Sequence, residues 1–331
     1  MIDPGRTNTP VEMATLKVLL SATTPLTTDI LANRIKVEPK ALQSAVELLC
    51  QTGCVIDEHP QQGLLLVEAG LGVWSDYLAY VSHRPRSVMV YQQLTSTQDA
   101  CRRRVGRSGP VPEGDLVVAD EQTAGRGRLG RRWEAAAGSS VLFSMIHCDR
   151  TQTKPQTLIG QLSVAISVAL AEALEPLLPS DQGPIQIKWP NDLYINGQKL
   201  AGILVETVNT ASKIRAAIIG VGINIHQEAA QLPPATCPDA TSLSLCGART
   251  HRLHVLAKTL EAIDRALQQN DPHLLERWRS RSAILNQRTR LQSDGKIVAG
   301  QVLDLDPQWG LIIRTDSGTM AHLPAQTTTV I

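Results

Sequence analysis

Four arginines and three glycines stand together in the eight residues from Gly125 to Arg132. Arginine side chains bind carboxylate and phosphate groups through paired N–H donors, and glycines let the backbone wrap closely around a ligand. Apolar runs at Leu116–Ala119 and Val141–Met145 precede and follow this loop, and each is typical of a buried strand. The pattern predicts two strands that bracket a loop where two anionic groups are brought together.

The loop also matches the pattern G-x-G-x-x-G through Gly125, Gly127 and Gly130. A dinucleotide-binding turn requires the first glycine directly after a strand and a helix directly after the last glycine. Here Glu121–Ala124 separate the strand from Gly125, and a second strand follows instead of a helix. The dinucleotide interpretation is therefore disfavoured. On this stretch alone, a solvated basic hairpin loop stays open as the alternative.

A second segment, Ile185–Glu206, places one lysine where it could do chemistry. Lys188 stands at the end of a short predicted strand, directly before the proline-containing turn Trp189–Asp192. The pair Asn196-Gly197 then predicts a tight hairpin. A charged side chain at such a strand end can project into a pocket, although a surface lysine would be the simpler interpretation of this segment by itself.

The two segments belong to a longer series of motifs. EQTAGRGRLGRRW ends at Trp133, and KWPNDLYINGQKLAGILVE begins at Lys188. Ser96-Thr97-Gln98-Asp99 precedes them, and Gly220-Val221-Gly222-Ile223-Asn224 follows. In this order the motifs resemble those of biotin–protein ligases (holoenzyme synthetases), over roughly residues 88–228. Only Glu134–Ala137 departs from the more aromatic, proline-containing sequence of many relatives, which affects the expected packing over the ligand and not the chemistry.

The resemblance implies that biotin and ATP are the substrates, with Mg²⁺ as the metal. Biotinoyl-5′-AMP would form first, and its biotinoyl group would pass to a lysine of a biotin carboxyl carrier protein or domain. It implies catalytic roles for Lys188 and Arg128, while the metal ligands stay unknown. The implied biotin-binding residues are Ser96, Thr97, Gln98, Gln122, Arg126, Gly127, Arg128 and Lys188, and the implied nucleotide-binding residues are Gly125, Arg126, Arg128, Trp133, Gly222 and Asn224. A lipoate–protein ligase is the alternative enzyme.

Residues 1–67 predict three helices followed by two short strands. This resembles the winged helix-turn-helix domain of the bifunctional ligases, so that DNA is a candidate partner and a biotin-operon repressor a candidate function. The third helix offers Lys40, Gln43 and Ser44 for DNA binding. However, residues 1–70 carry five basic and eight acidic side chains, a net charge of −3. Because DNA affinity comes largely from neutralised phosphates, operator binding stays an open prediction. A purely transcriptional regulator that uses biotinoyl-AMP as corepressor is the alternative from another class.

The 331 residues predict an α+β protein of three units: the winged helix, a central ligase domain at 68–282 with a mixed sheet like that of class II synthetases, and a small C-terminal SH3-like β-barrel at 283–331. Turn signals separate five short predicted strands in the last unit. We expect no membrane span and no signal segment. We expect six reduced cysteines, no zinc site at Cys50 and Cys54, a cytoplasmic location and, from the resemblance, homodimer formation.

Overall fold

The computed structural model describes residues 10–82, 84, 86–106, 111–149, 154–209, 215–233, 237, 239–268, 271–306, 310–325 and 327–331. The chain begins with three helices and a two-stranded antiparallel sheet, as predicted. These elements are α1 (Pro10–Ser21), α2 (Thr28–Ile35), α3 (Pro39–Gln51), β1 (Val55–His59) and β2 (Gly63–Glu68). Thr27 caps α2 by accepting a hydrogen bond from the Ile30 N–H, and Pro39 occupies the first turn of α3, where no N–H donor is needed.

A short helical segment joins this unit to the rest of the protein. The sequence analysis assigned no helix to residues 70–86, which join the two units, but the structure has the 3₁₀ turn η1 (Leu71–Val73) and helix α4 (Trp74–Val81) there. The Trp74 indole is buried, and the Arg252 guanidinium lies over its ring at 5.2 Å. Tertiary packing of this one aromatic face therefore stabilises a helix that is too short to be stable by local propensity.

The central sheet is mixed and has the strand order β3-β4-β5-β9-β8-β7-β6. The pair β3–β4 is parallel and the other neighbours are antiparallel. Its strands are β3 (Val88–Leu94), β4 (Leu116–Gln122), β5 (Ser140–Asp149), β6 (Gln186–Lys188), β7 (Asp192–Ile195), β8 (Gln198–Asn209) and β9 (Arg215–Asn224). The predicted strands on both sides of the glycine–arginine loop are β4 and β5, and the predicted Asn196-Gly197 turn joins β7 to β8.

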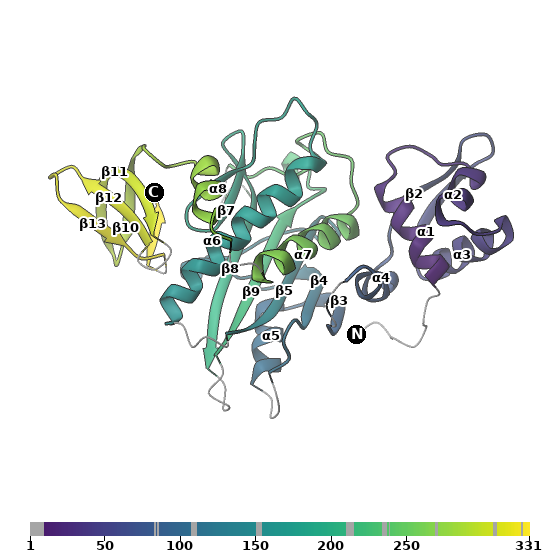
Figure 1. The fold of residues 1–331 in the computed structure, drawn as a ribbon, viewed down its shortest axis with the longest axis horizontal. Helices are drawn as coiled ribbons and strands as arrows, with labels where there is room; N and C mark the ends of the chain where they lie inside the picture. Colours follow the sequence, from purple (N-terminus) through teal and green to yellow (C-terminus); the bar gives the residue numbers. More distant parts are fainter. Residues whose placement is uncertain are drawn as a thin grey trace.

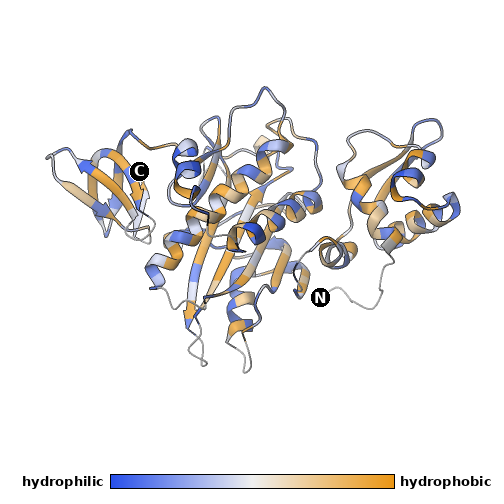
Figure 2. Ribbon diagram, in the orientation of Figure 1, coloured by the Kyte–Doolittle hydropathy of each residue, from blue (hydrophilic) through white to orange (hydrophobic). Residues whose placement is uncertain are grey.

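Helices cover both faces of this sheet (Figure 1). Helix α5 (Thr97–Val105) packs on one face against β4, β5 and β9, whereas α6 (Pro155–Leu174), α7 (Arg252–Gln268) and α8 (Leu274–Arg281) lie on the other. Alternate residues of a strand therefore enter two cores: Leu116 and Val118 belong to the core with α6 and α7, and Val117 to the core with α5. Figure 2 shows apolar residues gathered on the strands of the central sheet.

Among the described residues, one helical stretch, Pro155–Leu177, is long and apolar enough to cross a membrane by length and composition alone. However, 61% of its most apolar window is buried inside the protein. A core helix of a globular protein passes the same test, and the packing of α6 on β8 and α7 is that of a core helix.

The last five strands form an antiparallel sheet of order β13-β12-β11-β10-β14, in agreement with the predicted strand count. They are β10 (Arg288–Ser293), β11 (Lys296–Asp306), β12 (Gly310–Thr315), β13 (Met320–Leu323) and β14 (Thr328–Val330). The predicted turn at Asp294-Gly295 joins β10 to β11, with both residues at positive φ, whereas Trp309 of another predicted turn lies outside the described residues. The N-terminal unit and the C-terminal sheet lie on opposite sides of the central sheet (Figure 1).

Candidate functional site

A cavity of about 470 Å³ opens over β5, β7, β8 and β9. It is lined by both segments that the sequence singled out, the glycine–arginine loop and the turn after Lys188, and by two residues of β14, Thr329 and Val330. Most of the residues predicted to bind biotin or nucleotide line this cavity: Ser96, Thr97, Gln98, Gln122, Arg126, Gly127, Arg128, Trp133, Lys188, Gly222 and Asn224. Gly125 is absent from the lining, and its carbonyl instead accepts a hydrogen bond from the Trp133 N–H at 3.0 Å.

One end of the cavity is a polar cluster built at the start of α5. Gln122 accepts hydrogen bonds from the Thr97 N–H at 2.7 Å and the Thr97 hydroxyl at 3.1 Å. Ser144 on β5 lies 2.8 Å from the Thr97 hydroxyl and donates to Gln98 at 2.9 Å. Because each of these side chains holds the next one, their donors and acceptors have fixed directions before any ligand arrives.

Ser96 stands at the N-cap position of α5 but makes no side-chain cap bond. Its hydroxyl is buried and has no hydrogen-bond partner among the described residues. A buried hydroxyl without a partner costs free energy, so this group is suited to a polar ligand in the adjoining cavity. The polar end therefore matches a ligand that carries both N–H donors and a carbonyl acceptor.

Two glycines, Gly202 of β8 and Gly222 of β9, face each other across the two strands and form the floor in the middle of the cavity. The Trp133 ring lies on both: a Cβ built on Gly222 would be 2.5 Å from Trp133 Cε2, and one built on Gly202 would be 2.9 Å from Cζ3. The predicted close approach at Gly222 is therefore used by the Trp133 indole. Trp133 Nε1 is buried and has no hydrogen-bond partner among the described residues.

Asn224 was also predicted to bind the nucleotide. Protein groups form hydrogen bonds with both ends of its side-chain amide. It donates to the Thr241 carbonyl at 2.9 Å and accepts from Gln227 Nε2 at 2.9 Å. Asn224 lies at the cavity wall and is 5% exposed. These bonds fix the direction in which the remaining N–H and the remaining oxygen lone pair of the amide face.

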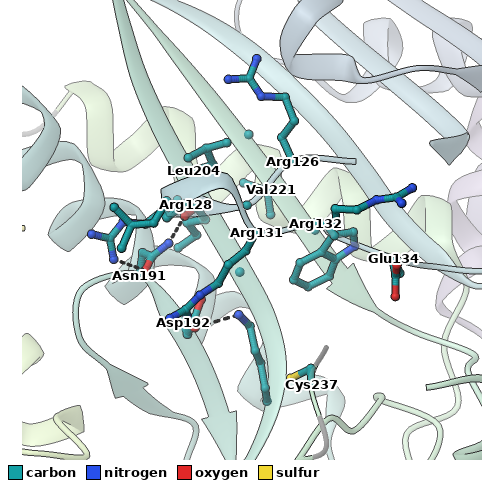
Figure 3. A pocket seen from close by; sticks show the side chains of 18 of the residues that line it. Arg126, Arg128, Arg131, Arg132, Glu134, Asn191, Asp192, Leu204, Val221 and Cys237 are labelled. Atoms are coloured by element: carbon teal, nitrogen blue, oxygen red, sulfur yellow. Dashed lines mark hydrogen bonds and ion pairs between the residues drawn. The ribbon is translucent and has the colours of Figure 1, made fainter. Parts of the chain in front are cut away.

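Each of the four arginines of the loop has its own acceptor, and these acceptors lie on several different elements. Arg126 pairs with Asp99 of α5 at 2.5 Å and with Glu206 of β8 at 2.9 Å, and in Figure 3 its side chain points away from those of Arg128 and Arg131. Arg131 donates to the Thr329 hydroxyl at 3.3 Å. Arg132, the most C-terminal, donates to the Thr123 carbonyl at 3.1 Å.

Arg128 ties the loop to the C-terminal sheet. Its guanidinium donates to the carbonyls of Ala325 and Thr328 and, at 3.3 Å, to Asn191 in the turn after Lys188. Burial lowers the pKa of Arg128 to about 10, although the nearby Asp192 raises it, so the side chain stays protonated at neutral pH. The cation is therefore desolvated, which strengthens its attraction for an anion that enters the cavity.

Lys188 presents its charge differently. Its ammonium lies 5.0 Å from the ring centroid of Tyr194 and has no hydrogen-bond or ion-pair partner among the described residues. Burial, and then the negative charge of Asp192, raise the pKa of the Tyr194 hydroxyl, so this ring stays neutral beside the lysine. Lys188 therefore keeps its donors available within the cavity.

The sequence analysis missed several cavity residues: Ser144, Asn191, Asp192, Tyr194, Lys199 and Gly202. Asp192 and Lys199 form an ion pair of 2.7 Å across the β7–β8 hairpin. Their signal was present, because the predicted Asn196-Gly197 turn brings the two strands face to face. Their pairing depends on the register shift between Leu193 and Tyr194, which the sequence does not reveal.

Comparison with known proteins agrees with this site. Residues 90–224 match the model of the biotin/lipoate A/B protein ligase family. The chain is 32% identical over 238 residues to the bifunctional ligase/repressor BirA of Bacillus subtilis (strain 168). The aligned region covers 70% of this chain and 70% of that protein. The chain belongs to the biotin/lipoate A/B protein ligase family. The resemblance seen in the sequence is thereby confirmed.

Other members of the family are similar as well. The biotin–[acetyl-CoA-carboxylase] ligase of Mycobacterium tuberculosis is 32% identical over 250 residues, which cover 72% of this chain and 90% of that protein. The biotin protein ligase from Aquifex aeolicus in complex with biotin and ATP has a TM-score of 0.58 and 27% identity, over 74% of this chain and 98% of that chain. The expected α+β fold with a central mixed sheet is therefore confirmed, and of the C-terminal unit, which was expected to be an SH3-like barrel, an antiparallel sheet is confirmed.

The residues predicted to contact DNA lie outside residues 90–224, the region that matches the family model. Lys40, Gln43 and Ser44 are all exposed on α3. The Gln43 amide is 3.4 Å from the Glu47 carboxylate one helical turn away, so an acidic side chain stands beside the proposed contact surface.

Proposed function

We propose that the protein is an ATP-dependent biotin–protein ligase. It would activate biotin as biotinoyl-5′-AMP and transfer it to a lysine of the biotin carboxyl carrier domain of a biotin-dependent carboxylase. The observation that carries this proposal is the cavity itself, in which a rigid polar end, an indole floor and the cations of Lys188 and Arg128 share one space. Biotin and ATP are named with a similar structure, that of the Aquifex aeolicus ligase.

We infer that the biotin ring system occupies the polar end. The ureido group has two N–H donors and one carbonyl acceptor, and the free hydroxyl of Ser96 and the fixed amides of Gln98 and Gln122 offer matching groups. The biotin carboxylate would then extend towards Lys188 and the backbone of Gly127. The adenine nucleotide would lie against Trp133, whose buried Nε1 offers a donor.

In the first step an oxygen of the biotin carboxylate attacks the α-phosphorus of ATP. A mixed anhydride bond forms, the bond between the α-phosphorus and the bridging oxygen breaks, and pyrophosphate leaves with that oxygen. Two anions approach each other, so fixed positive charge lowers the barrier most where it lies beside the oxygens that gain charge. Lys188 is the cation whose donors are available for this role, and Arg128 would join it by exchanging its protein acceptors for the ligand.

In the second step the neutral amine of the acceptor lysine attacks the acyl carbon. An amide bond forms, the bond from the acyl carbon to the phosphate oxygen breaks, AMP leaves, and the nitrogen releases a proton to solvent. The indole floor and the loop would keep water from the anhydride until the acceptor arrives. Thus Trp133 would protect the intermediate as well as bind it.

Mg²⁺ would enter with ATP, because this ion is usually held by substrate phosphates together with one or two carboxylates. Asp192 and Asp239 are carboxylates that line the cavity. The described residues contain no group of three or more His, Cys, Asp or Glu side chains that could hold a metal by themselves. The ion would supply further charge compensation for the phosphate oxygens.

The test is a reaction of the full chain with ATP, MgCl₂, biotin and a purified carrier domain. Mass spectrometry should show one biotinoyl addition on the carrier, together with AMP and pyrophosphate. Octanoate and lipoate replace biotin in parallel reactions, since the alternative function is a lipoate–protein ligase. Modification with lipoate but not with biotin would contradict the proposal.

A second candidate function, biotin-dependent repression, is favoured by the bifunctional ligase/repressor relatives and by the N-terminal unit. We propose that residues 1–67 form a winged helix with α3 as recognition helix and β1–β2 as wing, followed by a ligase domain at 68–282 and an SH3-like barrel at 283–331. Binding of the protein to its own promoter only in the presence of biotin and ATP would support repression. Equal binding to random DNA would count against it.

Two further expectations belong to this proposal. Cys50, Cys54, Cys101, Cys237 and Cys246 carry free thiols, which fits a cytoplasmic location. A homodimer is expected from the family resemblance, and analytical ultracentrifugation with and without biotin plus ATP would measure it. A monomer in both conditions would remove dimer formation from the proposed mechanism of repression.

A further inference from the structure

Lys199 stands where three parts of the cavity wall meet. Its backbone N–H donates to the Asp239 carbonyl at 2.6 Å, and its carbonyl accepts from the Thr241 N–H at 2.8 Å. Its ammonium forms the 2.7 Å ion pair with Asp192 and lies 5.6 Å from the centroid of the Trp133 ring. One residue of β8 thus contacts the turn after Lys188, the loop indole and the segment before α7.

The glycine pair explains why this arrangement is tightly determined. A Cβ on Gly202 would lie within 3.5 Å of Trp133 Cζ3, Asp192 Oδ1 and Lys199 Cε. These three side chains therefore meet over the same glycine. Gly202 and Gly222 themselves offer no side chain that could hold the edge of the Trp133 ring. The cation of Lys199, itself held in place by Asp192, supplies an attraction to the ring.

We propose that Lys199 is a positioning residue that holds Trp133 as the wall of the nucleotide half of the cavity. This inference rests on the proposed biotin–protein ligase function and adds a residue to it. Lys199 acts on the nucleotide through Trp133, whereas Lys188 acts on the reacting oxygens. Loss of Lys199 should therefore weaken the use of ATP and leave biotin binding at the polar end unchanged, since no contact in that cluster involves Lys199.

The experiment compares Lys199→Met, which keeps the length of the side chain but removes its charge, with Lys199→Arg, which keeps both the ion pair and the attraction to the ring. The KM for ATP in biotinoyl-AMP formation should rise roughly 5- to 10-fold in Lys199→Met, about the size of a partly buried cation–π contact. Lys199→Arg should restore it to within about 3-fold of the wild type, because arginine also stacks on aromatic rings. The Kd for biotin, measured by equilibrium dialysis without ATP, should change less than about 2-fold.

A double-mutant cycle separates positioning from a general structural effect. In the Trp133→Leu background, which has no ring to hold, Lys199→Met should raise the KM for ATP by less than about 2-fold, because the coupled contact is already absent. An equal fold-change in both backgrounds would overturn the proposal, as would a wild-type KM in Lys199→Met. If Lys199→Met does not fold, Lys199→Gln removes the same charge with a polar side chain of similar length and faces the same two outcomes.

The wild-type reaction distinguishes this inference from the proposed function. A wild-type chain that forms no biotinoyl-AMP would contradict the ligase function itself. A wild-type chain that forms it, together with a Lys199→Met variant that uses ATP and biotin normally, would overturn only the role of Lys199. Lys296→Met, at the exposed hairpin between β10 and β11, is the matched control and should leave every constant unchanged.

Discussion

The glycine–arginine loop, residues 125–132, and the turn that begins at Lys188 line the same cavity but present their positive charges in different ways. Every arginine of the loop donates to a protein acceptor, from Asp99 and Glu206 at one side to the C-terminal sheet at the other. The ammonium of Lys188 has no such acceptor among the described residues. The number of cations in a site therefore does not tell how many are available for catalysis.

This difference also changes how the loop should be understood. On charge alone, four neighbouring arginines should repel each other and keep the loop unfolded until anions bind. In the structure the guanidinium groups diverge and are individually compensated, so part of that repulsion is removed by the protein (Figure 3). An anionic ligand would then compete with protein acceptors for the Arg128 guanidinium, whereas the N–H donors of the Lys188 ammonium are available to it.

The largest effect is expected from Lys188→Ala. Adenylate formation should fall roughly 10²-fold, or about 3 kcal/mol, because the variant loses the cation whose donors are available where charge develops. Pyrophosphate release measures the rate, and thermal unfolding should match the wild type. Lys258→Ala, on the exposed side of α7, is the control. Wild-type pyrophosphate release in Lys188→Ala would remove this contrast between the two regions.

A smaller effect is expected from Arg128→Gly. The adenylate should dissociate roughly 10- to 100-fold faster, because a charged hydrogen bond contributes about 1.5–3 kcal/mol, while adenylation itself relies chiefly on Lys188. The released intermediate would then modify lysines of bystander proteins, which mass spectrometry of added albumin would detect. Arg132→Gly, whose arginine donates to the Thr123 carbonyl and to no other acceptor in the described part of the chain, should not have this effect. An Arg128→Gly protein that modifies only the carrier domain would show that the contact does not retain the intermediate.

The third prediction concerns how fast trypsin cleaves the loop in the free protein and in the complex with ligands. Trypsin should cleave the free protein after Arg126, Arg128 or Arg131, and biotin plus ATP should slow this cleavage roughly 10-fold, because a loop clamped on an anion opens less often. Peptide mapping identifies the cleaved bonds. Equal cleavage rates with and without the ligands would mean that the loop is as ordered in the free protein as in the complex.

The smallest effect is expected from deletion of residues 1–67. Biotinoyl-AMP formation should stay within about 3-fold of the full chain, because the lining of the cavity begins at Ser96 and the Trp74–Arg252 contact is retained. Pyrophosphate release again gives the rate. A loss of more than about 10-fold, in a truncated protein that still unfolds cooperatively, would show that the N-terminal unit supports both regions of the site.

The sequence by itself determined the elements with strong local signals. Thr27 and Pro39 mark helix starts, the Asn196-Gly197 pair marks the β7–β8 turn, and the two apolar runs around the loop became β4 and β5. The motif order was sufficient for the family, and most of the residues that it predicted for the ligands line the cavity. These features are local because they depend on backbone preferences and on hydrophobic spacing within a few residues.

Only the tertiary structure decided which groups meet. Arg128 contacts Asn191 and Thr328, which are 63 and 200 positions away, and such pairings leave no periodic signal in the chain. Helix α4 was missed because a buried tryptophan under Arg252 stabilises it from outside. Likewise, Gly222 was expected to face a ligand and lies under Trp133 instead, since the sequence shows that a close approach is allowed but not what approaches. Packing makes that choice, because side chains from distant elements must fill the space that glycine leaves open.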